Sequence, residues 1–281
     1  MAQLLVHGGV SGRPLIRMPE IDHALAPSSG NAVDLVEAAV RRLEDDPNLN
    51  AGWGAVLDRD GRLELDAGIA DGHSGRCAGV ANVTVRHPIS LARRVMEETP
   101  HALLTGGGAQ AFAEGMETLG SSTPEQQARW SAASAAGELD LARFGSPEYV
   151  DTVGAIALDD SGALAAGSST GGVFGKMPGR VGDAPIFGAG IYASAHVAVM
   201  GTGVGELFLA TLASQRVGTM VEAGAHPQRA CEEVIAFLGT RALLPAGLLA
   251  IDSEGREGAA FRGGSLPVAS SSGKLRPVRL S

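Results

Sequence analysis

The sequence predicts a protein of the α/β (α+β) class, in which antiparallel sheets are covered by helices. Short apolar runs alternate with glycine-rich turns, and amphipathic stretches of helical length lie between them. This order of strands, helices and further strands occurs in each half of the 281-residue chain. Because 44% of the residues are hydrophobic and only 4% are aromatic, we expect a core built mainly from Ala, Val, Leu and Ile.

The first half of the chain is expected to begin with a short buried strand, followed by an amphipathic helix. The helix runs from Asn31, as its N-cap, to about Glu44, with its apolar residues on one stripe. The remaining predicted elements are a strand at 4–7, a hairpin made by 53–57 and 63–69, a helix at 88–98, a strand at 102–105, a turn at 106–108 and a helix at 109–116.

A change of composition separates the two halves. Residues 121–149 are rich in Ser, Ala, Gln, Glu and Gly, which predicts a linker over about 121–150 with a helical part near 125–136. The second half is expected to contain a hairpin of strands 152–158 and 163–169, a helix at 206–215, a helix at 227–238 with Gly239 as C-cap, and a hairpin over 248–261.

Charge and composition exclude several classes of function. The formal net charge is −9 and no basic patch is visible, so nucleic acid is not an expected partner. The two cysteines, Cys77 and Cys231, lack the spacing of a zinc site or a disulfide framework. No apolar run is long enough to span a membrane, and the N-terminus lacks the pattern of a secretory signal. We therefore expect a cytoplasmic protein organised as a single domain over 1–281.

The most informative position is Thr152, which follows Asp151 at the head of an apolar run. A threonine hydroxyl is a weak nucleophile unless a base lies beside it, and one solution is the α-amine of the same residue at a chain terminus. Such an amine titrates near ~8, close enough to neutral pH to accept a proton. The Asp151–Thr152 bond would first have to be cut through an N-to-O acyl shift. On spacing alone, the favoured interpretation is that Thr152 is simply a β-branched residue that starts a strand.

A set of short motifs in a fixed order resembles the plant-type L-asparaginase and isoaspartyl peptidase family of N-terminal-nucleophile hydrolases. The resemblance covers roughly Leu4 to Ile251, although Val173-Phe174-Gly175 departs from the family pattern. The motifs are Val6-His7-Gly8-Gly9, Asn50-Ala51-Gly52-Trp53-Gly54, Glu64-Leu65-Asp66-Ala67, Pro88-Ile89-Ser90-Leu91, Thr152-Val153-Gly154, Ser169-Thr170-Gly171-Gly172, Pro178-Gly179-Arg180-Val181-Gly182-Asp183 and Gly201-Thr202-Gly203-Val204-Gly205-Glu206.

This resemblance implies a four-layer αββα sandwich and a precursor that cuts itself into an α chain, 1–151, and a β chain, 152–281. The mature αβ unit is expected to pair into a dimer. Thr152 would then be both nucleophile and, through its amine, base, with Thr170 as a second active-site threonine. The implied activity is hydrolysis of β-aspartyl dipeptides and of L-asparagine, with no catalytic cofactor.

The resemblance also assigns the groups that contact the substrate. Arg180 and Asp183 would bind the α-carboxylate and α-ammonium of an aspartyl group, which suits an arginine fork and a carboxylate. Thr202 and Gly203 match the oxyanion-hole positions, where donors meet the charge on the attacked carbonyl. Gly205 matches a backbone position that contacts the substrate.

A loop and a histidine are expected to have structural roles. The segment 43–51 matches a loop that holds a structural sodium through main-chain oxygens, although a plain helix-to-strand turn is an equal alternative. Its candidate ligands are the main-chain oxygens of Leu43, Glu44, Asp46, Leu49 and Ala51. His7 is expected to be a structural histidine and not a base.

Two other functions remain open at this point. One is a glycosylasparaginase-like amidase, which would usually carry an export signal. The other is a non-catalytic protein of the same fold that holds amino-acid-like ligands through Arg180 and Asp183. An uncut chain that binds aspartate would favour the second.

Overall fold

Two sheets stacked face to face form the centre of the protein. The computed structural model describes residues 2–11, 20–26, 29–139 and 152–281. The strands of the larger sheet are β1 (Gln3–His7), β2 (Leu65–Asp71), β3 (Arg76–Val83), β4 (Leu103–Thr105), β5 (Val153–Leu158), β6 (Leu164–Thr170) and β11 (Val268–Ser270). Their order is β11-β1-β5-β6-β2-β3-β4. The smaller sheet has the order β12-β10-β9-β8-β7, with β7 (Ile191–Ala193), β8 (Val197–Gly203), β9 (Ala246–Asp252), β10 (Glu257–Arg262) and β12 (Val278–Leu280).

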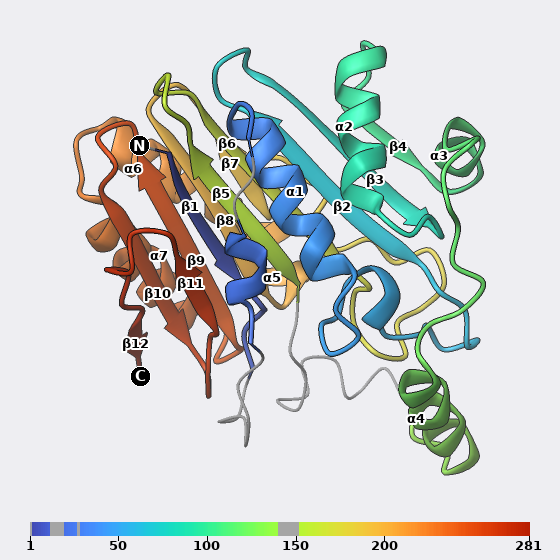
Figure 1. The fold of residues 1–281 in the computed structure, drawn as a ribbon. Helices are drawn as coiled ribbons and strands as arrows, with labels where there is room; N and C mark the ends of the chain where they lie inside the picture. Colours follow the sequence, from blue (N-terminus) through green and yellow to red (C-terminus); the bar gives the residue numbers. More distant parts are fainter. Residues whose placement is uncertain (1, 12–19, 27–28, 140–151) are drawn as a thin grey trace.

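Helices cover the outer face of each sheet. The helices on the larger sheet are α1 (Ala32–Glu44), α2 (Pro88–Glu98) and α3 (Gly106–Phe112), and those on the smaller sheet are α6 (Ala213–Glu222) and α7 (Pro227–Arg241). In Figure 1, α1 and α2 cross in front of the strands of the larger sheet. Helix α5 (Gly205–Thr211) directly precedes α6, and its Leu207 and Phe208 are part of the core on the smaller sheet. Helix α4 (Pro124–Ala135) stands apart at the lower right of the view (Figure 1). Short 3-10 turns occur at Asp22–Leu25 and Gly52–Gly54.

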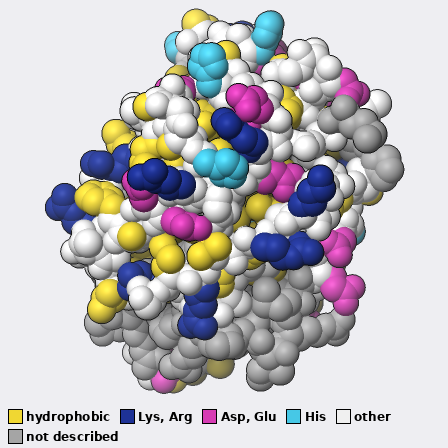
Figure 2. Space-filling view, turned by 90° about the vertical axis from the view of Figure 1, so that its left-hand side faces the viewer, with side chains coloured by type: hydrophobic (Ala, Val, Ile, Leu, Met, Phe, Trp, Pro, Cys, Tyr) yellow, Lys and Arg dark blue, Asp and Glu magenta, His cyan; other side chains and the backbone are white. Residues whose placement is uncertain are grey.

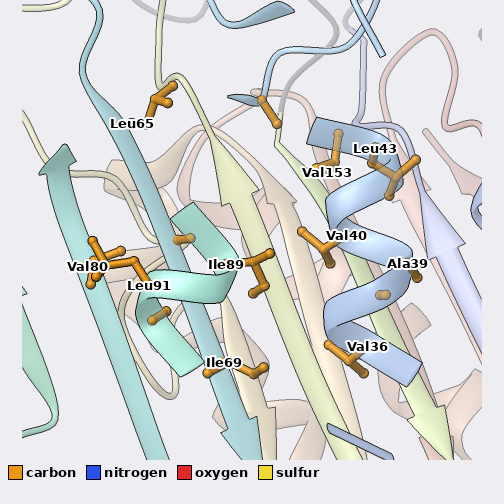
Figure 3. Packing of buried hydrophobic residues seen from close by; sticks show 14 of the residues in the cluster. Val36, Ala39, Val40, Leu43, Leu65, Ile69, Val80, Ile89, Leu91 and Val153 are labelled. Atoms are coloured by element: carbon orange, nitrogen blue, oxygen red, sulfur yellow. The ribbon is translucent and has the colours of Figure 1, made fainter. Parts of the chain in front are cut away.

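Three apolar cores separate the four layers. One lies between the larger sheet and α1 and α2, where Val36 and Val40 of α1 and Ile89 of α2 point onto the strands (Figure 3). A second lies between the two sheets and includes Ile156 and Met200. The third packs α6 and α7 onto the smaller sheet. The predicted αββα sandwich is therefore confirmed.

Local sequence signals explain where the covering helices begin. The Asn31 side chain accepts the backbone N–H of Asp34 at 3.0 Å, and the Asp34 carboxylate accepts the N–H of Asn31 at 2.9 Å. This reciprocal capping box satisfies two of the donors that a helix leaves open at its start. Helix α2 begins with Pro88, which lacks an N–H and suits the first turn. Both predicted starts are confirmed.

Several predicted elements differ in the structure. Residues 53–57 form no strand, and the hairpin partner of β2 is β3. The reason is that the N–H of Val56 donates to the Asn50 side chain rather than to a neighbouring strand. The predicted helix 206–215 is broken at Leu212, whose φ of 49° is left-handed, so it becomes α5 and α6.

Glycines account for two further differences, and the helix expected at 109–116 ends at Phe112. Gly106 enters α3 with a φ of 55°, and the next two glycines lie within the first turn of the helix instead of forming a separate turn. Gly239 lies inside α7, which continues to Arg241. A Cβ at Gly239 would lie 2.2 Å from the guanidinium of Arg262, so this glycine allows close packing against β10 and is not a C-cap.

The described part of the predicted linker 121–150 contains α4, which confirms its helical part. The side chain of Gln126 donates to the Gly54 carbonyl at 3.3 Å, and Ser122 donates to the Ala55 carbonyl, so the segment is anchored to the turn after α1. Within the part of the chain that the structure describes, no helix combines the length and the apolar character needed to cross a membrane. Figure 2 shows one side of the molecule, where basic and acidic side chains are interspersed.

Candidate active site

Thr152 lies where the two sheets meet. It directly precedes β5, in the middle of the larger sheet, and only 2% of its surface is exposed. The hydroxyl of Thr202, near the end of β8 in the smaller sheet, donates to the main-chain oxygen of Thr152 at 3.3 Å. The same hydroxyl accepts the N–H of Val10 at 3.3 Å. Two of the predicted catalytic threonines are thus in contact.

Thr170 lies at the same end of the larger sheet. Strands β5 and β6 pair antiparallel with Val153 opposite Ser169, so Thr152 and Thr170 flank that pair at one edge. The Thr170 hydroxyl accepts the N–H of Gly172 at 2.9 Å, which fixes the start of the following loop. The predicted second threonine is therefore beside the first because of the strand register.

His7 is buried beside this group and cannot serve as a base near neutral pH. Its Nδ1 accepts the N–H of Gly9 at 3.1 Å. Burial lowers the pKa of His7 to about 3, against an opposing effect from the Thr152 backbone. The ring is therefore neutral, which agrees with the structural role expected from the sequence.

Arg180, Asp183 and Gly205 converge on one small space. A Cβ at Gly205 would lie 2.8 Å from Arg180 Nη2 and 2.9 Å from Asp183 Oδ1. A Cβ at Gly172 would lie 3.3 Å from Arg180 Nη1. Since Gly172 is hydrogen-bonded to Thr170, the predicted clamp and the predicted threonines form one continuous site. Asp183 is only 3% exposed, so its carboxylate acts in a region of weak solvent screening.

The guanidinium of Arg180 also has a partner that the sequence analysis did not single out. Its Nε and Nη2 donate to the two carboxylate oxygens of Glu206, each at 2.9 Å. This bidentate geometry turns the remaining nitrogen, Nη1, toward Gly172 and Gly182. Glu206 belongs to the motif that contains Gly205, but its charge gave no signal that it would hold the arginine.

Thr202 and Gly203 close the site from the smaller sheet. Gly203 has a φ of 143°, which side chains rarely adopt, and a Cβ there would lie 2.5 Å from the Pro245 carbonyl oxygen. Glycine is thus required for the close approach of β8 and the segment before β9. Of the two predicted oxyanion-hole residues, Thr202 contacts the Thr152 backbone directly, and Gly203 follows it at the end of β8.

Asn50 holds the loop that follows Thr170. Its side chain donates to the Gly172 carbonyl at 2.7 Å, and its main-chain oxygen accepts the N–H of Gly171 at 3.0 Å. Asn50 was part of a recognised motif, but its contact over 122 residues of sequence is visible only in the fold. Lys176, at the end of this loop, is also missed by the sequence analysis because a lysine in a loop is usually exposed, whereas this one is buried.

The unusual stretch Val173-Phe174-Gly175 is a contact point for the segment after α3. The guanidinium of Arg129, on α4, lies 3.9 Å from the centroid of the Phe174 ring. A Cβ at Gly175 would lie 3.3 Å from the side chain of Leu139. This departure from the family pattern therefore coincides with a contact between α4 and the active-site loop.

The candidate sodium loop contains a cluster of main-chain oxygens. A Cβ at Gly54 would lie 2.3 Å from the oxygen of Leu49, 2.7 Å from that of Pro47 and 2.8 Å from that of Asp46. The oxygen of Glu44 points instead at Gly52, 2.4 Å from the equivalent position. The oxygens of Asp46 and Leu49 also accept the N–H groups of Leu49 and Ala51, at 3.2 and 2.9 Å, and Pro47 was not in the predicted set.

One predicted site residue cannot be placed. Asp151, the residue before the expected cut, lies outside the described residues. The predicted cleavage bond therefore has only its Thr152 side in the structure, at the buried end of β5.

The αββα sandwich is the fold of the N-terminal-nucleophile hydrolases, the class that includes the asparaginase family. A model of the asparaginase family matches residues 19–275, and the chain belongs to that family. This confirms the resemblance drawn from the motifs.

Named relatives cover most of the chain. An isoaspartyl peptidase of Salmonella typhimurium is 44% identical over 86% of this chain and 81% of its own. A plant-type L-asparaginase of Pyrobaculum calidifontis is 39% identical over 91% and 92% of the two chains. A human isoaspartyl peptidase/L-asparaginase is 35% identical over 97% and 94%.

Proposed function

We propose that the protein is an autoprocessing amidohydrolase that hydrolyses β-aspartyl dipeptides and L-asparagine, with Thr152 as the N-terminal nucleophile. The observation that carries this is the position of Thr152, buried at the start of β5 and in contact with the Thr202 hydroxyl. The names of the relatives support the substrate class.

Maturation creates the base that the reaction needs. The Thr152 hydroxyl attacks the Asp151 carbonyl carbon, and the amide nitrogen leaves as the α-amine of Thr152. Water then hydrolyses the resulting ester, which frees the hydroxyl and releases Asp151 with a carboxylate. The products are an α chain, 1–151, and a β chain, 152–281. An amine with a pKa near ~8 can take a proton from its own hydroxyl.

Hydrolysis of the substrate follows the same chemistry. The Thr152 hydroxyl gives its proton to the α-amine and attacks the side-chain carbonyl carbon of the aspartyl group. The charge on the carbonyl oxygen is stabilised by donors at Thr202 and Gly203. The amine returns the proton to the departing nitrogen, and water attacks the ester to release aspartate. Thr170 supports the loop beside the nucleophile through Gly172.

The substrate is held by opposite charges at one end. Arg180 binds the α-carboxylate and Asp183 the α-ammonium, in the space bordered by Gly205. Glu206 accepts from Nε and Nη2 of the arginine, and Nη1 lies toward Gly172 and Gly182. This arrangement favours a ligand that carries both charges on one carbon.

We also propose a structural sodium at the main-chain oxygens near Gly54, with Asp46 and Leu49 from the predicted set. It takes no part in the reaction, and no catalytic cofactor is needed. The mature αβ units are proposed to form a dimer, and the cytoplasmic location stays a prediction.

The deciding experiment is a denaturing intact-mass spectrum after incubation at neutral pH, followed by a turnover assay with a β-aspartyl dipeptide and with asparagine. Two chains separated at the 151/152 boundary, together with release of aspartate, support the proposal. An uncut chain that binds aspartate without turnover would instead indicate a non-catalytic binding protein. Turnover of a glycosylated asparagine in preference to both substrates would indicate a glycosylasparaginase.

A further inference from the structure

The loop that carries Arg180 and Asp183 is tied to the start of β2 at two backbone positions. The N–H of Gly179, next to Arg180, donates to both carboxylate oxygens of Glu64, at 2.9 and 3.1 Å. The N–H of Gly182, next to Asp183, donates to the carboxylate of Asp66 at 3.3 Å. Each member of the clamp therefore directly follows a glycine whose N–H is held by an acidic side chain.

A third tie is made by the buried lysine of the same loop. The ammonium of Lys176 donates to the main-chain oxygen of Glu64 at 2.9 Å, and only 1% of this residue is exposed. Burial lowers the pKa of Lys176, and the charges of Asp66 and Glu64 act in the opposite direction. Burial likewise raises the pKa of Asp66, against the effect of Lys176. The positive charge of Lys176 and the negative charges of Asp66 and Glu64 thus offset one another beneath the loop.

The same group is connected to the catalytic end of the sheet. Asp66 lies opposite Thr170 in the pairing of β2 with β6. Its second carboxylate oxygen accepts the N–H of Asn82 at 3.0 Å, which fixes the carboxylate from the far side. The position of the Asp66 carboxylate relative to the threonines is therefore set by the sheet and not by a mobile side chain.

We propose that Glu64, Asp66 and Lys176 are positioning residues that set Arg180 and Asp183 at a fixed distance from Thr152. This inference rests on the proposed function, since it assigns how the substrate clamp of that site is held. Buried charged groups seldom add net stability, because their desolvation offsets their attraction. A catalytic clamp, however, must hold its geometry within about half an ångström, which a loop held only by its own turns does not ensure.

The test separates binding from chemistry with two variants at Glu64. Glu64→Ala removes the acceptor for Gly179, and we expect the KM for a β-aspartyl dipeptide to rise roughly tenfold, as for the loss of one charge-assisted hydrogen bond, while kcat stays within about twofold. Glu64→Gln keeps an amide oxygen that can accept the same N–H, so it should restore most of the wild-type KM. Self-cleavage, followed by intact mass, should be complete in both.

Asp66→Asn provides an independent variant, and Asp252→Asn is its matched control. Asp66 accepts two backbone N–H groups and an asparagine can accept only one of them, so KM should rise again. Asp252 is also buried and accepts the N–H groups of Glu254 and Arg256. It lies at the end of β9, whereas Gly203 of β8 pairs with the start of β9. Asp252→Asn should lower the melting temperature and leave KM unchanged.

Two results would overturn the inference. An unchanged KM in Glu64→Ala, whether or not kcat falls, or an equal rise of KM in Asp252→Asn would each show that the ties do not position the clamp. Should Glu64→Ala be insoluble, the KM of Asp66→Asn decides. A wild-type protein that is cut but hydrolyses neither substrate would refute the proposed function instead, and is recognised before any variant is made.

Discussion

Glu206 holds Arg180 by two parallel N–H···O bonds of 2.9 Å, so the fork of the arginine is already bidentate before any ligand arrives. Glu206 is about half exposed, whereas the Arg180 side chain is largely covered. The acid therefore acts as an outer brace that points the inner edge of the guanidinium into the site.

Removing this brace should weaken substrate binding. In Glu206→Ala the guanidinium loses two hydrogen bonds and its fixed orientation, so we expect KM for a β-aspartyl dipeptide to rise about three- to tenfold with kcat nearly unchanged. Steady-state kinetics measure both values. A fall in KM would show that Glu206 competes with the substrate for Arg180 rather than orienting it.

Thr152→Ala should abolish both self-cleavage and hydrolysis. The variant keeps the backbone of β5 but has no hydroxyl to attack either the Asp151 carbonyl or the substrate. Intact mass should show one uncut chain, and aspartate release should fall to the background. A variant that still hydrolyses the dipeptide would exclude Thr152 as the nucleophile.

Gly205→Ala should block the clamp while leaving maturation intact. The added methyl group would lie 2.8 Å from Arg180 Nη2 and 2.9 Å from Asp183 Oδ1, inside the proposed binding space. We expect KM to rise at least tenfold, about 1.4 kcal/mol or more in binding. The matched control is Gly107→Ala, where no atom lies within 4 Å of the added carbon, and its kinetics should equal those of the wild type.

The lowered pKa of His7 makes the stability of the protein depend on pH. Its folded pKa of about 3 lies below the ordinary value of 6.5, so the unfolded chain binds a proton that the folded protein excludes. The free energy of unfolding should therefore fall by up to about 1.4 kcal/mol per pH unit as pH drops below 6.5 toward 3. Denaturant titrations at a series of pH values give the free energy of unfolding for the wild type and for His7→Gln. The slopes of this free energy against pH should differ by close to one proton. Equal slopes would mean that the ring is protonated in the folded protein.

The sequence predicted best what depends on local patterns. The strand at 152–158 and its partner were correct because β-strands with a turn of Asp, Ser and Gly between them are specified by neighbouring residues. The strand at 53–57 was wrong because the N–H of Val56 is satisfied by Asn50, a contact that periodicity does not reveal. Lys176 and Glu206 were missed for the same reason, since their partners come from distant segments.

The strand order of the larger sheet affects how the mature protein could refold. Strands β1 and β2 come before the predicted cut, and β5, β6 and β11 come after it. In the sheet, β1 lies between β5 and β11, and β2 lies beside β6 (Figure 1). A cut before Thr152 would leave two polypeptides that share one sheet and cannot part without unfolding. Folding of the precursor is intramolecular, whereas reassembly of the pieces would depend on their concentration. Maturation would thus make unfolding harder to reverse, because a denatured mature enzyme would refold far less readily than the uncut precursor.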